Sequence, residues 1–239
     1  MKNVLVVGGT SGVGLSIALN LHEVNCIYIL GRHQPEVDLP KNISYHFMDL
    51  RTFDLSSLNK FNDIDTLIIS AGFGNLSLFE ELTDEEIQEY FSVNSVAVIR
   101  IIKFFYSKLL RKPNFYCAVL GSISGFISSP FFSVYAATKA ALRIFIESVN
   151  IELEKAGSAN RILHVAPGAI KGTSFAGGEN IPEKTKVLAL QIIDKIKAKE
   201  DLFIPNYDDI FKEVLQRAFD DFREAGRQSY EYKKSSGRV

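Results

Sequence analysis

The sequence predicts a single α/β domain built on a doubly wound, mostly parallel sheet with helices on both faces. Short apolar stretches of strand length alternate with longer stretches whose apolar residues recur at helical spacing, which is the pattern of repeated strand–helix units. A glycine-rich turn joins the first strand to the first helix, as in nucleotide-binding α/β folds. The 239 residues contain no repeat, no low-complexity segment and no interdomain linker, so we expect residues 1–239 to form one domain.

The amino-terminal unit carries the first functional signal. Asn3–Val7 is a short apolar strand, and the following Gly8-Gly-Thr-Ser-Gly12-Val-Gly14 leads into a helix with an apolar stripe. Gly8 permits a tight turn, Gly12 lets a ligand approach the backbone, and Gly14 permits close packing of the helix. The free N–H groups and positive dipole end of that helix would face a pyrophosphate. The loop predicts dinucleotide binding, although its spacing is G-x-x-x-G-x-G rather than G-x-G-x-x-G.

The second strand, Cys26–Leu30, ends in Gly31-Arg32-His33. At this position NAD-binding folds place an acidic side chain for the ribose 2′-hydroxyl, whereas an arginine accommodates a 2′-phosphate. This chain has Gly31 there with Arg32 beside it, so a guanidinium is present and a repelling carboxylate is absent. The sequence therefore favours NADP(H) over NAD(H). The alternative is that Arg32 is a solvated residue of a turn.

Two further strands bring small or polar residues to the same edge of the sheet. Ile43–Phe47 is followed by Asp49 and Leu50, which we expect near the adenine. Asp65–Ser70 is followed by Ala71-Gly72, whose small side chains let the backbone pass close to a cofactor.

A long helix follows and ends near Leu110. Thr83–Glu86 forms a capping box at its start, and an apolar stripe continues to Phe105. Asn94 lies inside this helix, although asparagine is a mediocre helix former. Two interpretations stay open: Asn94 faces solvent, or its amide points into the active site.

The most informative stretch runs from Ser122 to Lys139. Ser122 closes the apolar strand Phe115–Gly121, so its hydroxyl emerges at the carboxyl end of that strand. Tyr135 and Lys139 are four residues apart near the start of a helix and share one of its faces. A hydroxyl, a phenol and an ammonium can therefore converge at the edge of the sheet.

This arrangement supports proton transfer at a carbonyl or alcohol oxygen. A phenol in water has a pKa of about 10. An ammonium about 4 Å away favours the phenolate by about 4 kcal/mol at an effective dielectric constant of about 20, which lowers the pKa by roughly 3 units to about 7. Tyr135 would then act as a general acid or base, with Ser122 hydrogen-bonded to the same substrate oxygen. Alternatively, Tyr135 and Lys139 are unrelated residues of an exposed helix, because Y-x-x-x-K also arises by chance.

The carboxyl-terminal third supplies the far end of the cleft. The strand Ile162–Ala166 runs into a Pro167-Gly168 turn at the carboxyl edge of the sheet, where ligands of open α/β folds bind. Beyond it the pattern predicts a helix, an edge strand, a second helix and a polar, frayed tail: Glu183–Lys199, Leu202–Pro205, Asp208–Glu224 and the residues from Gln228.

Composition argues against several other classes of protein. The net charge of −1 gives no basic excess for nucleic acid or an anionic membrane. No apolar stretch approaches the roughly 18 residues of a membrane span, and Met1-Lys2-Asn3 leads straight into a strand, which leaves no room for a signal peptide. Cys26 and Cys117 lie in apolar strand-like stretches, and we expect buried thiols in a reducing cytoplasm rather than a disulfide. The four histidines are scattered, which argues against a metal site.

Together these motifs resemble those of the short-chain dehydrogenase/reductase family in its non-extended branch. The resemblance covers roughly Val4 to Thr173, in family order and spacing, including the step of thirteen residues from Ser122 to Tyr135. It implies a Rossmann fold and a catalytic set of Ser122, Tyr135 and Lys139, with Asn94 completing a tetrad through a water bound to the lysine. The residues it implies for cofactor binding, besides Tyr135 and Lys139, are Gly8, Thr10, Ser11, Gly12, Val13, Gly14, Arg32, Asp49, Leu50, Ala71, Gly72, Pro167, Gly168, Ile170 and Thr173.

By this resemblance the chain would be an NADP(H)-dependent oxidoreductase that transfers a hydride between the nicotinamide and a small carbonyl or hydroxy compound. Tyr135 would exchange the proton, Lys139 would lower its pKa and hold the nicotinamide ribose, and Ser122 would position the substrate oxygen. The resemblance also implies a substrate lid and specificity region over about 174–225, and assembly into a homodimer or homotetramer. Aromatic residues near the expected cleft hint at an apolar substrate, although each could be core: Phe73, Phe126, Phe131, Phe132 and Phe175.

The chain departs from the family pattern at Ile69-Ser70, which replaces an Asn-Asn pair that ties the central strands together. The lost amides either cost stability or are compensated elsewhere. A second function also stays open, that of a dinucleotide-binding sensor or scaffold without turnover, and the complete Ser–Tyr–Lys set argues against it. An epimerase or dehydratase on the same scaffold usually has a larger substrate domain than this length allows.

Overall fold

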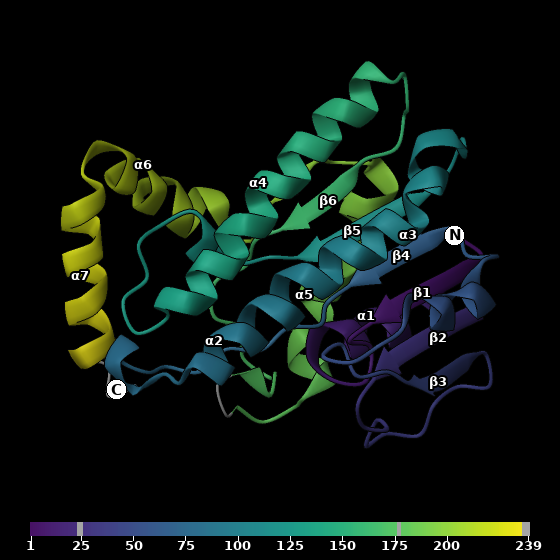
Figure 1. The fold of residues 1–239 in the computed structure, drawn as a ribbon, viewed down its shortest axis with the longest axis horizontal. Coiled ribbons are helices and arrows are strands. Elements are labelled where there is room, and N and C mark those ends of the chain that lie inside the picture. Colours follow the sequence, from purple (N-terminus) through teal and green to yellow (C-terminus); the bar gives the residue numbers. More distant parts are fainter. Residues whose placement is uncertain (23–25, 176–177, 236–239) are drawn as a thin grey trace.

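The computed structural model describes residues 1–22, 26–175 and 178–235 and has the expected α/β architecture (Figure 1). Seven strands form one sheet in the order β3-β2-β1-β4-β5-β6-β7, and every neighbouring pair is parallel. The strands are β1 (Asn3–Val7), β2 (Cys26–Gly31), β3 (Ile43–Phe47), β4 (Thr66–Ile69), β5 (Tyr116–Leu120), β6 (Ile162–Val165) and β7 (Leu202–Phe203). The prediction of a single, doubly wound parallel sheet is confirmed.

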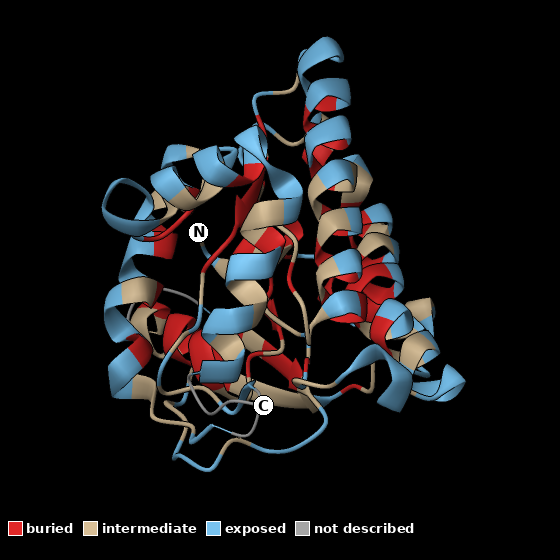
Figure 2. Cartoon of the chain, turned by 90° about the vertical axis from the view of Figure 1, so that its left-hand side faces the viewer, coloured by how far each residue is buried: buried red, intermediate tan, exposed pale blue. Residues whose placement is uncertain are grey.

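Helices cover both faces of this sheet. Helices α1 (Gly12–Leu21) and α5 (Pro182–Ala198) pack on one face, and α3 (Ala97–Arg111) and α4 (Ser133–Lys155) pack on the other. Successive residues of β1 alternate between the two hydrophobic cores, as side chains of a strand must. Figure 2 shows the buried residues on the strands and on the sheet-facing sides of the helices. Burial on both faces explains why the strands read as continuous apolar stretches.

The strand order reverses at β1, which pairs with β2 on one side and with β4 on the other. In open α/β sheets, ligands bind outside the carboxyl ends of the strands at such a reversal. The glycine-rich turn leaves β1 at this point, so the topology places the expected phosphate loop at the centre of the carboxyl edge.

The long helix predicted from the capping box is interrupted once. Helix α2 (Asp84–Phe91) begins at the expected box, in which Glu86 N–H donates to Thr83 Oγ1 at 3.2 Å and Thr83 N–H donates to Glu86 Oε2 at 2.9 Å. A π-helical turn over Ser92–Val96 then separates α2 from α3. Such turns are frequent at functional sites, and this one contains Asn94.

The carboxyl-terminal region differs from the prediction. After β7 the chain forms a π-helical turn (Tyr207–Phe211), α6 (Lys212–Asp220) and α7 (Phe222–Ser235), where a single helix over Asp208–Glu224 was expected. Asp221 breaks that helix because its backbone is extended, with φ −145° and ψ 90°, and its carboxylate accepts a hydrogen bond from Glu224 N–H at 2.8 Å. An Asp-x-x-Glu pattern can start a helix, so the sequence contained a signal for the start of α7.

The frayed tail expected from Gln228 is helical to Ser235 in the structure, and residues 236–239 lie outside the described residues. Helix α7 stays in place because its side chains reach back to the segment before α4. Tyr230 stacks on Phe131, with ring centroids 4.7 Å apart. Lys233 Nζ donates to Ser129 Oγ and to Pro130 O, both at 2.8 Å.

Neither cysteine forms a disulfide, but only one is buried. Cys117 lies inside β5, whereas Cys26, which we expected to be buried, is exposed at the first position of β2. The strand begins at the molecular surface, and its first side chain lies outside the core. Within the ranges that the structure describes, no helix is both long and apolar enough to cross a bilayer.

Candidate active site

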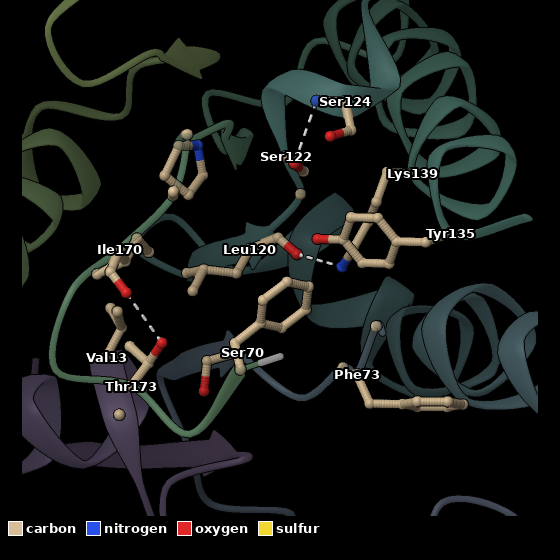
Figure 3. Close-up of a pocket in the computed structure, with 18 of the residues that line it drawn as sticks. Val13, Ser70, Phe73, Leu120, Ser122, Ser124, Tyr135, Lys139, Ile170 and Thr173 are labelled. Carbon is tan, nitrogen blue, oxygen red and sulfur yellow. Dashed lines mark hydrogen bonds between the residues drawn. The ribbon is translucent and has the colours of Figure 1, made fainter. Parts of the chain in front are cut away.

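A cavity of about 1730 Å³ runs along the carboxyl ends of the strands (Figure 3). Pockets for one small ligand usually have about 300–1,000 Å³, so this cavity has room for a dinucleotide and a second molecule. It is lined by every residue that the sequence assigned to cofactor binding, together with Ser122, Tyr135 and Lys139. Asn94 is the exception, because it lies behind the cavity wall.

The glycine loop forms one end of the cavity and requires its glycines. Gly8 has φ +84°, and a Cβ there would lie 2.4 Å from Ala71 N. Gly12 has φ +53°, a conformation that side chains rarely adopt, and the nearest atom to a Cβ would be Thr173 Cγ2 at 3.4 Å. A Cβ on Gly14 would lie 2.1 Å from Ser70 Oγ. The backbone at the start of α1 therefore borders the cavity directly, which fits a ligand with a phosphate group.

Ser70 compensates for the asparagine pair that the chain lacks. Its hydroxyl donates to Gly8 O at 3.0 Å and lies 3.3 Å from Val7 O. Ser70 N–H also donates to Val7 O at 2.8 Å. A short hydroxyl therefore ties the end of β4 to the end of β1 and to the glycine loop, where the family pattern uses amides.

Tyr135 and Lys139 lie on one face of α4, and both are buried. Burial raises the pKa of Tyr135 to about 12, because the phenolate would lose its hydration, and a hydrogen bond with Ser122 opposes this rise. Burial also lowers the pKa of Lys139 to about 8. The expected pKa near 7 for Tyr135 is therefore wrong, because burial shifts it in the opposite direction.

The position of the ammonium helps to explain this difference. Lys139 Nζ lies 5.6 Å from the centroid of the Tyr135 ring and donates to Leu120 O at 3.0 Å, as the dashed line in Figure 3 shows. The ammonium is therefore hydrogen-bonded to a carbonyl oxygen at the end of β5. Desolvation of the phenolate consequently dominates the pKa of Tyr135. The sequence predicted which groups meet, but not which effect is larger.

Asn94 is fully buried, with 0% exposure, so the solvent-facing interpretation is wrong. Its Oδ1 accepts a hydrogen bond from Phe73 N–H at 3.0 Å, and its Nδ2 donates to Phe73 O at 2.9 Å. A Cβ on Gly72 would lie 3.2 Å from Asn94 Oδ1 and 3.3 Å from Lys139 Nζ. The π-helical turn thus places this amide against Gly72, which the lysine ammonium also approaches.

The opposite end of the cavity carries two arginines. Arg32, at the end of β2, lines the cavity as expected. Asp49 also lines it, but Arg51 holds its carboxylate: Arg51 Nε donates to both oxygens, at 2.9 and 3.0 Å. These hydrogen bonds lower the pKa of Asp49 to about 2. The sequence prediction missed Arg51, although an Asp-x-Arg spacing permits this pairing.

The part of the cavity around Tyr135 is rich in aromatic rings. The Phe175 ring centroid lies 5.2 Å from that of Tyr135, and the Phe132 centroid lies 5.3 Å from it. A Cβ on Gly74 would lie 2.8 Å from both Tyr135 and Phe175. Among the five phenylalanines proposed from sequence, Phe73, Phe132 and Phe175 line the cavity. The other two pack elsewhere: Phe126 on His164 and Phe131 on Tyr230.

Helices α6 and α7 also contribute to this end of the cavity, which the sequence indicated only as a region. Side chains from the turn before α6, from α6 and from α7 line it: Ile210, Phe211, Val214, Arg217, Gln228, Ser229, Tyr232 and Lys233. In the part of the chain that the structure describes, no group of three or more histidine, cysteine or carboxylate side chains could hold a metal ion.

Comparison with known proteins agrees with this geometry. The family model for short chain dehydrogenases matches residues 2–184. A probable short-chain type dehydrogenase/reductase from Helicobacter pylori, VdlC, is 28% identical over 204 residues, which cover 79% of this chain and 72% of VdlC. Among solved structures, a Burkholderia phymatum short-chain dehydrogenase/reductase in complex with NAD has a TM-score of 0.78 at 14% identity and covers 93% of this chain and 94% of its own. A Sphingobium yanoikuyae short-chain dehydrogenase in complex with NADPH has a TM-score of 0.72 at 21% identity, with 92% and 96% covered.

Proposed function

Because the chain belongs to the short-chain dehydrogenase/reductase family, whose members are oxidoreductases that use a nicotinamide cofactor, we propose that it is an NADP(H)-dependent reductase or dehydrogenase. Its substrate would be a small carbonyl or hydroxy compound with an apolar body. One observation carries the proposal: Ser122, Tyr135 and Lys139 line the same cavity as the glycine loop.

The bound cofactor would supply or accept the hydride. The glycine loop and the amino terminus of α1 would hold its pyrophosphate, and the small residues Ala71 and Gly72 would border its nicotinamide half. A Cβ on Gly72 would lie 3.3 Å from Lys139 Nζ, so a larger residue at this position would crowd the ammonium.

The proton chemistry follows from the state of each group. With a pKa of about 12, the Tyr135 phenol is protonated near neutral pH and can donate its proton to a carbonyl oxygen. The phenolate left behind would be stabilised by the Ser122 hydroxyl and by the charge of Lys139. In the reverse direction the same phenolate would accept the proton of an alcohol. We propose that Asn94 is a positioning residue for Lys139, because its amide lies beside the ammonium.

The preference for NADP(H) rests on Arg32. Its guanidinium lines the adenosine end of the cavity, and a Cβ on Gly31 would lie 2.4 Å from Thr10 Oγ1, so an acidic side chain has no room there. In Arg32→Ala, the ratio of NADPH to NADH affinity should fall at least tenfold, because a charge-assisted contact with the 2′-phosphate is lost. Titration calorimetry with both cofactors measures this ratio. An unchanged ratio would remove Arg32 as the basis of the preference.

An apolar substrate is supported by the rings around Tyr135. Phe73, Phe132 and Phe175 line the cavity beside the phenol, and Val214 and Ile210 face the same end from α6 and the turn before it. A carbonyl compound with an aromatic or branched aliphatic body would bury its apolar surface there, which favours binding by about 25 cal/mol for each Å² removed from water.

The second candidate is a dinucleotide sensor without turnover, and the raised pKa of Tyr135 favours it, because an untuned phenol is a weak acid. Oxidation of NADPH by the wild-type protein against a panel of aromatic and aliphatic aldehydes and ketones separates the two functions. Turnover with any member supports the reductase. Tight NADPH binding without turnover across the panel supports the sensor.

We also propose a cytoplasmic location and assembly into a homodimer or homotetramer. Both cysteines are free thiols, which suits a reducing compartment. On α4, Ile144 is 59% exposed and Ile151 is 50% exposed, and they offer an apolar surface for a second copy. Light scattering at several protein concentrations measures the assembly directly.

A further inference from the structure

The amino terminus of α1 is capped by a side chain from a distant part of the sequence. Gly12 N–H, the first of the helix, donates to Asn180 Oδ1 at 2.7 Å across 168 positions of the chain. Ser11 occupies the N-cap position but makes no side-chain hydrogen bond to the helix. An amide oxygen from outside the glycine loop therefore accepts from Gly12 N–H, one of the four N–H groups that have no partner within the helix.

Packed helices set the position of Asn180. The residue precedes Ile181, the N-cap residue of α5, and Ile181 N–H donates to Gly172 O at 3.0 Å. On the other side, Ser16 Oγ of α1 donates to Pro182 O at 3.3 Å. Because α1 and α5 pack together on one face of the sheet, these contacts hold Asn180 beside the glycine loop.

We propose that Asn180 is a surrogate for the cofactor's pyrophosphate and thereby determines the affinity for the dinucleotide. Its amide oxygen accepts from Gly12 N–H, and a phosphate oxygen that binds this donor would have to displace it. An anionic acceptor forms a hydrogen bond roughly twice as strong as a neutral one, so the phosphate oxygen replaces the amide oxygen of Asn180 when the cofactor binds. The affinity is nevertheless reduced by the hydrogen bond that must first break. The inference rests on the proposed function and concerns a residue that contacts the glycine loop of that site.

The test compares NADPH binding by the wild type and Asn180→Ala. Without the competing amide oxygen, NADPH should bind about fivefold more tightly, which corresponds to about 1 kcal/mol for one net hydrogen bond. Asn180→Asp should bind at least tenfold more weakly, because a carboxylate holds the Gly12 donor more strongly and repels the phosphates. Asn59→Ala, an equal truncation at an exposed residue of the 3-10 helix Leu55–Phe61, should leave the affinity unchanged. If Asn180→Ala leaves NADPH affinity unchanged or weakens it, the surrogate role is wrong.

A second measurement separates this claim from the proposed function. Amide hydrogen exchange at Gly12 in the cofactor-free protein should be at least fivefold faster in Asn180→Ala than in the wild type, and inorganic pyrophosphate should bind the variant more tightly. If the wild type binds neither NADPH nor NADH, the proposed function fails, and these two readouts still decide the role of Asn180. Equal exchange rates or equal pyrophosphate affinities would overturn it.

Discussion

At the scale of one residue, Tyr135 illustrates a competition between burial and charge. A nearby ammonium was expected to bring its pKa to about 7, yet burial raises the pKa to about 12. Burial also destabilises the cation of Lys139, whose Nζ is bonded to Leu120 O. The spacing of Tyr135 and Lys139 predicts that they share a helix face, but depth of burial and the direction of an ammonium depend on residues far away in the sequence. The meeting of these side chains in one cavity was therefore predictable, and their pKa values were not.

His164 is a second residue whose environment the sequence did not reveal. It is 4% exposed in β6, and its Nε2 has no hydrogen-bond partner among the described residues. Burial, with the charges of Lys139 and Arg143, lowers its pKa to about 4. A histidine in the unfolded chain takes up its proton near pH 6.5, whereas the folded protein resists it until about pH 4.

The pH dependence of stability follows from this difference. Between about pH 6.5 and pH 4 the unfolded chain binds more protons, so the free energy of unfolding should fall as the pH is lowered, by up to about 3 kcal/mol from this group. His164→Gln, which cannot titrate, should flatten that part of the profile. Urea unfolding at half-unit pH steps measures both proteins. Profiles of equal slope would show that other groups cause the acid instability.

At the scale of an element, helix α7 lines the cavity, although its polar sequence did not predict this. Its composition predicts a frayed tail, yet the stack of Tyr230 on Phe131 fixes the helix against the segment before α4. Phe131 adopts φ +65°, which is unusual for an aromatic residue. Tertiary contacts thus override a weak local preference, and α7 forms part of the cavity wall.

Loss of the aromatic stack should affect the substrate more than the cofactor. In Tyr230→Ala the KM for carbonyl substrates should rise about fivefold, because the ring pair contributes about 1 kcal/mol to the position of α7. The affinity for NADPH should stay within about twofold, since the glycine loop lies at the other end. Glu231→Ala, an exposed neighbour on the same helix, is the matched control. Steady-state kinetics with the best substrate of the panel measures KM for both variants. A Tyr230→Ala variant with the same KM as the wild type and Glu231→Ala would contradict this role of α7.

At the scale of the whole molecule, the sequence predicts the repeated strand–helix units of the fold, but it does not predict the long-range hydrogen bonds around the glycine loop. Continuous apolar strands and alternating helices determine the parallel sheet, and the sheet topology brings Gly12, Ser122 and Tyr135 to one edge. The hydrogen bond of Asn180 to Gly12 spans 168 positions, and no local pattern encodes it. Ser70 replaces two amides with one hydroxyl, which only the distance to Gly8 O reveals.

The most direct test of the central claim, that the Tyr135 phenol exchanges the proton in a nicotinamide-dependent reaction, is the kcat of Tyr135→Phe. Removal of one hydroxyl from a buried ring should lower kcat for carbonyl reduction by about 10²- to 10⁴-fold, the usual contribution of a general acid. NADPH affinity should change by less than about twofold, because the ring itself remains in place. A variant that retains kcat within tenfold of the wild type, with NADPH still bound, would show that another group supplies the proton.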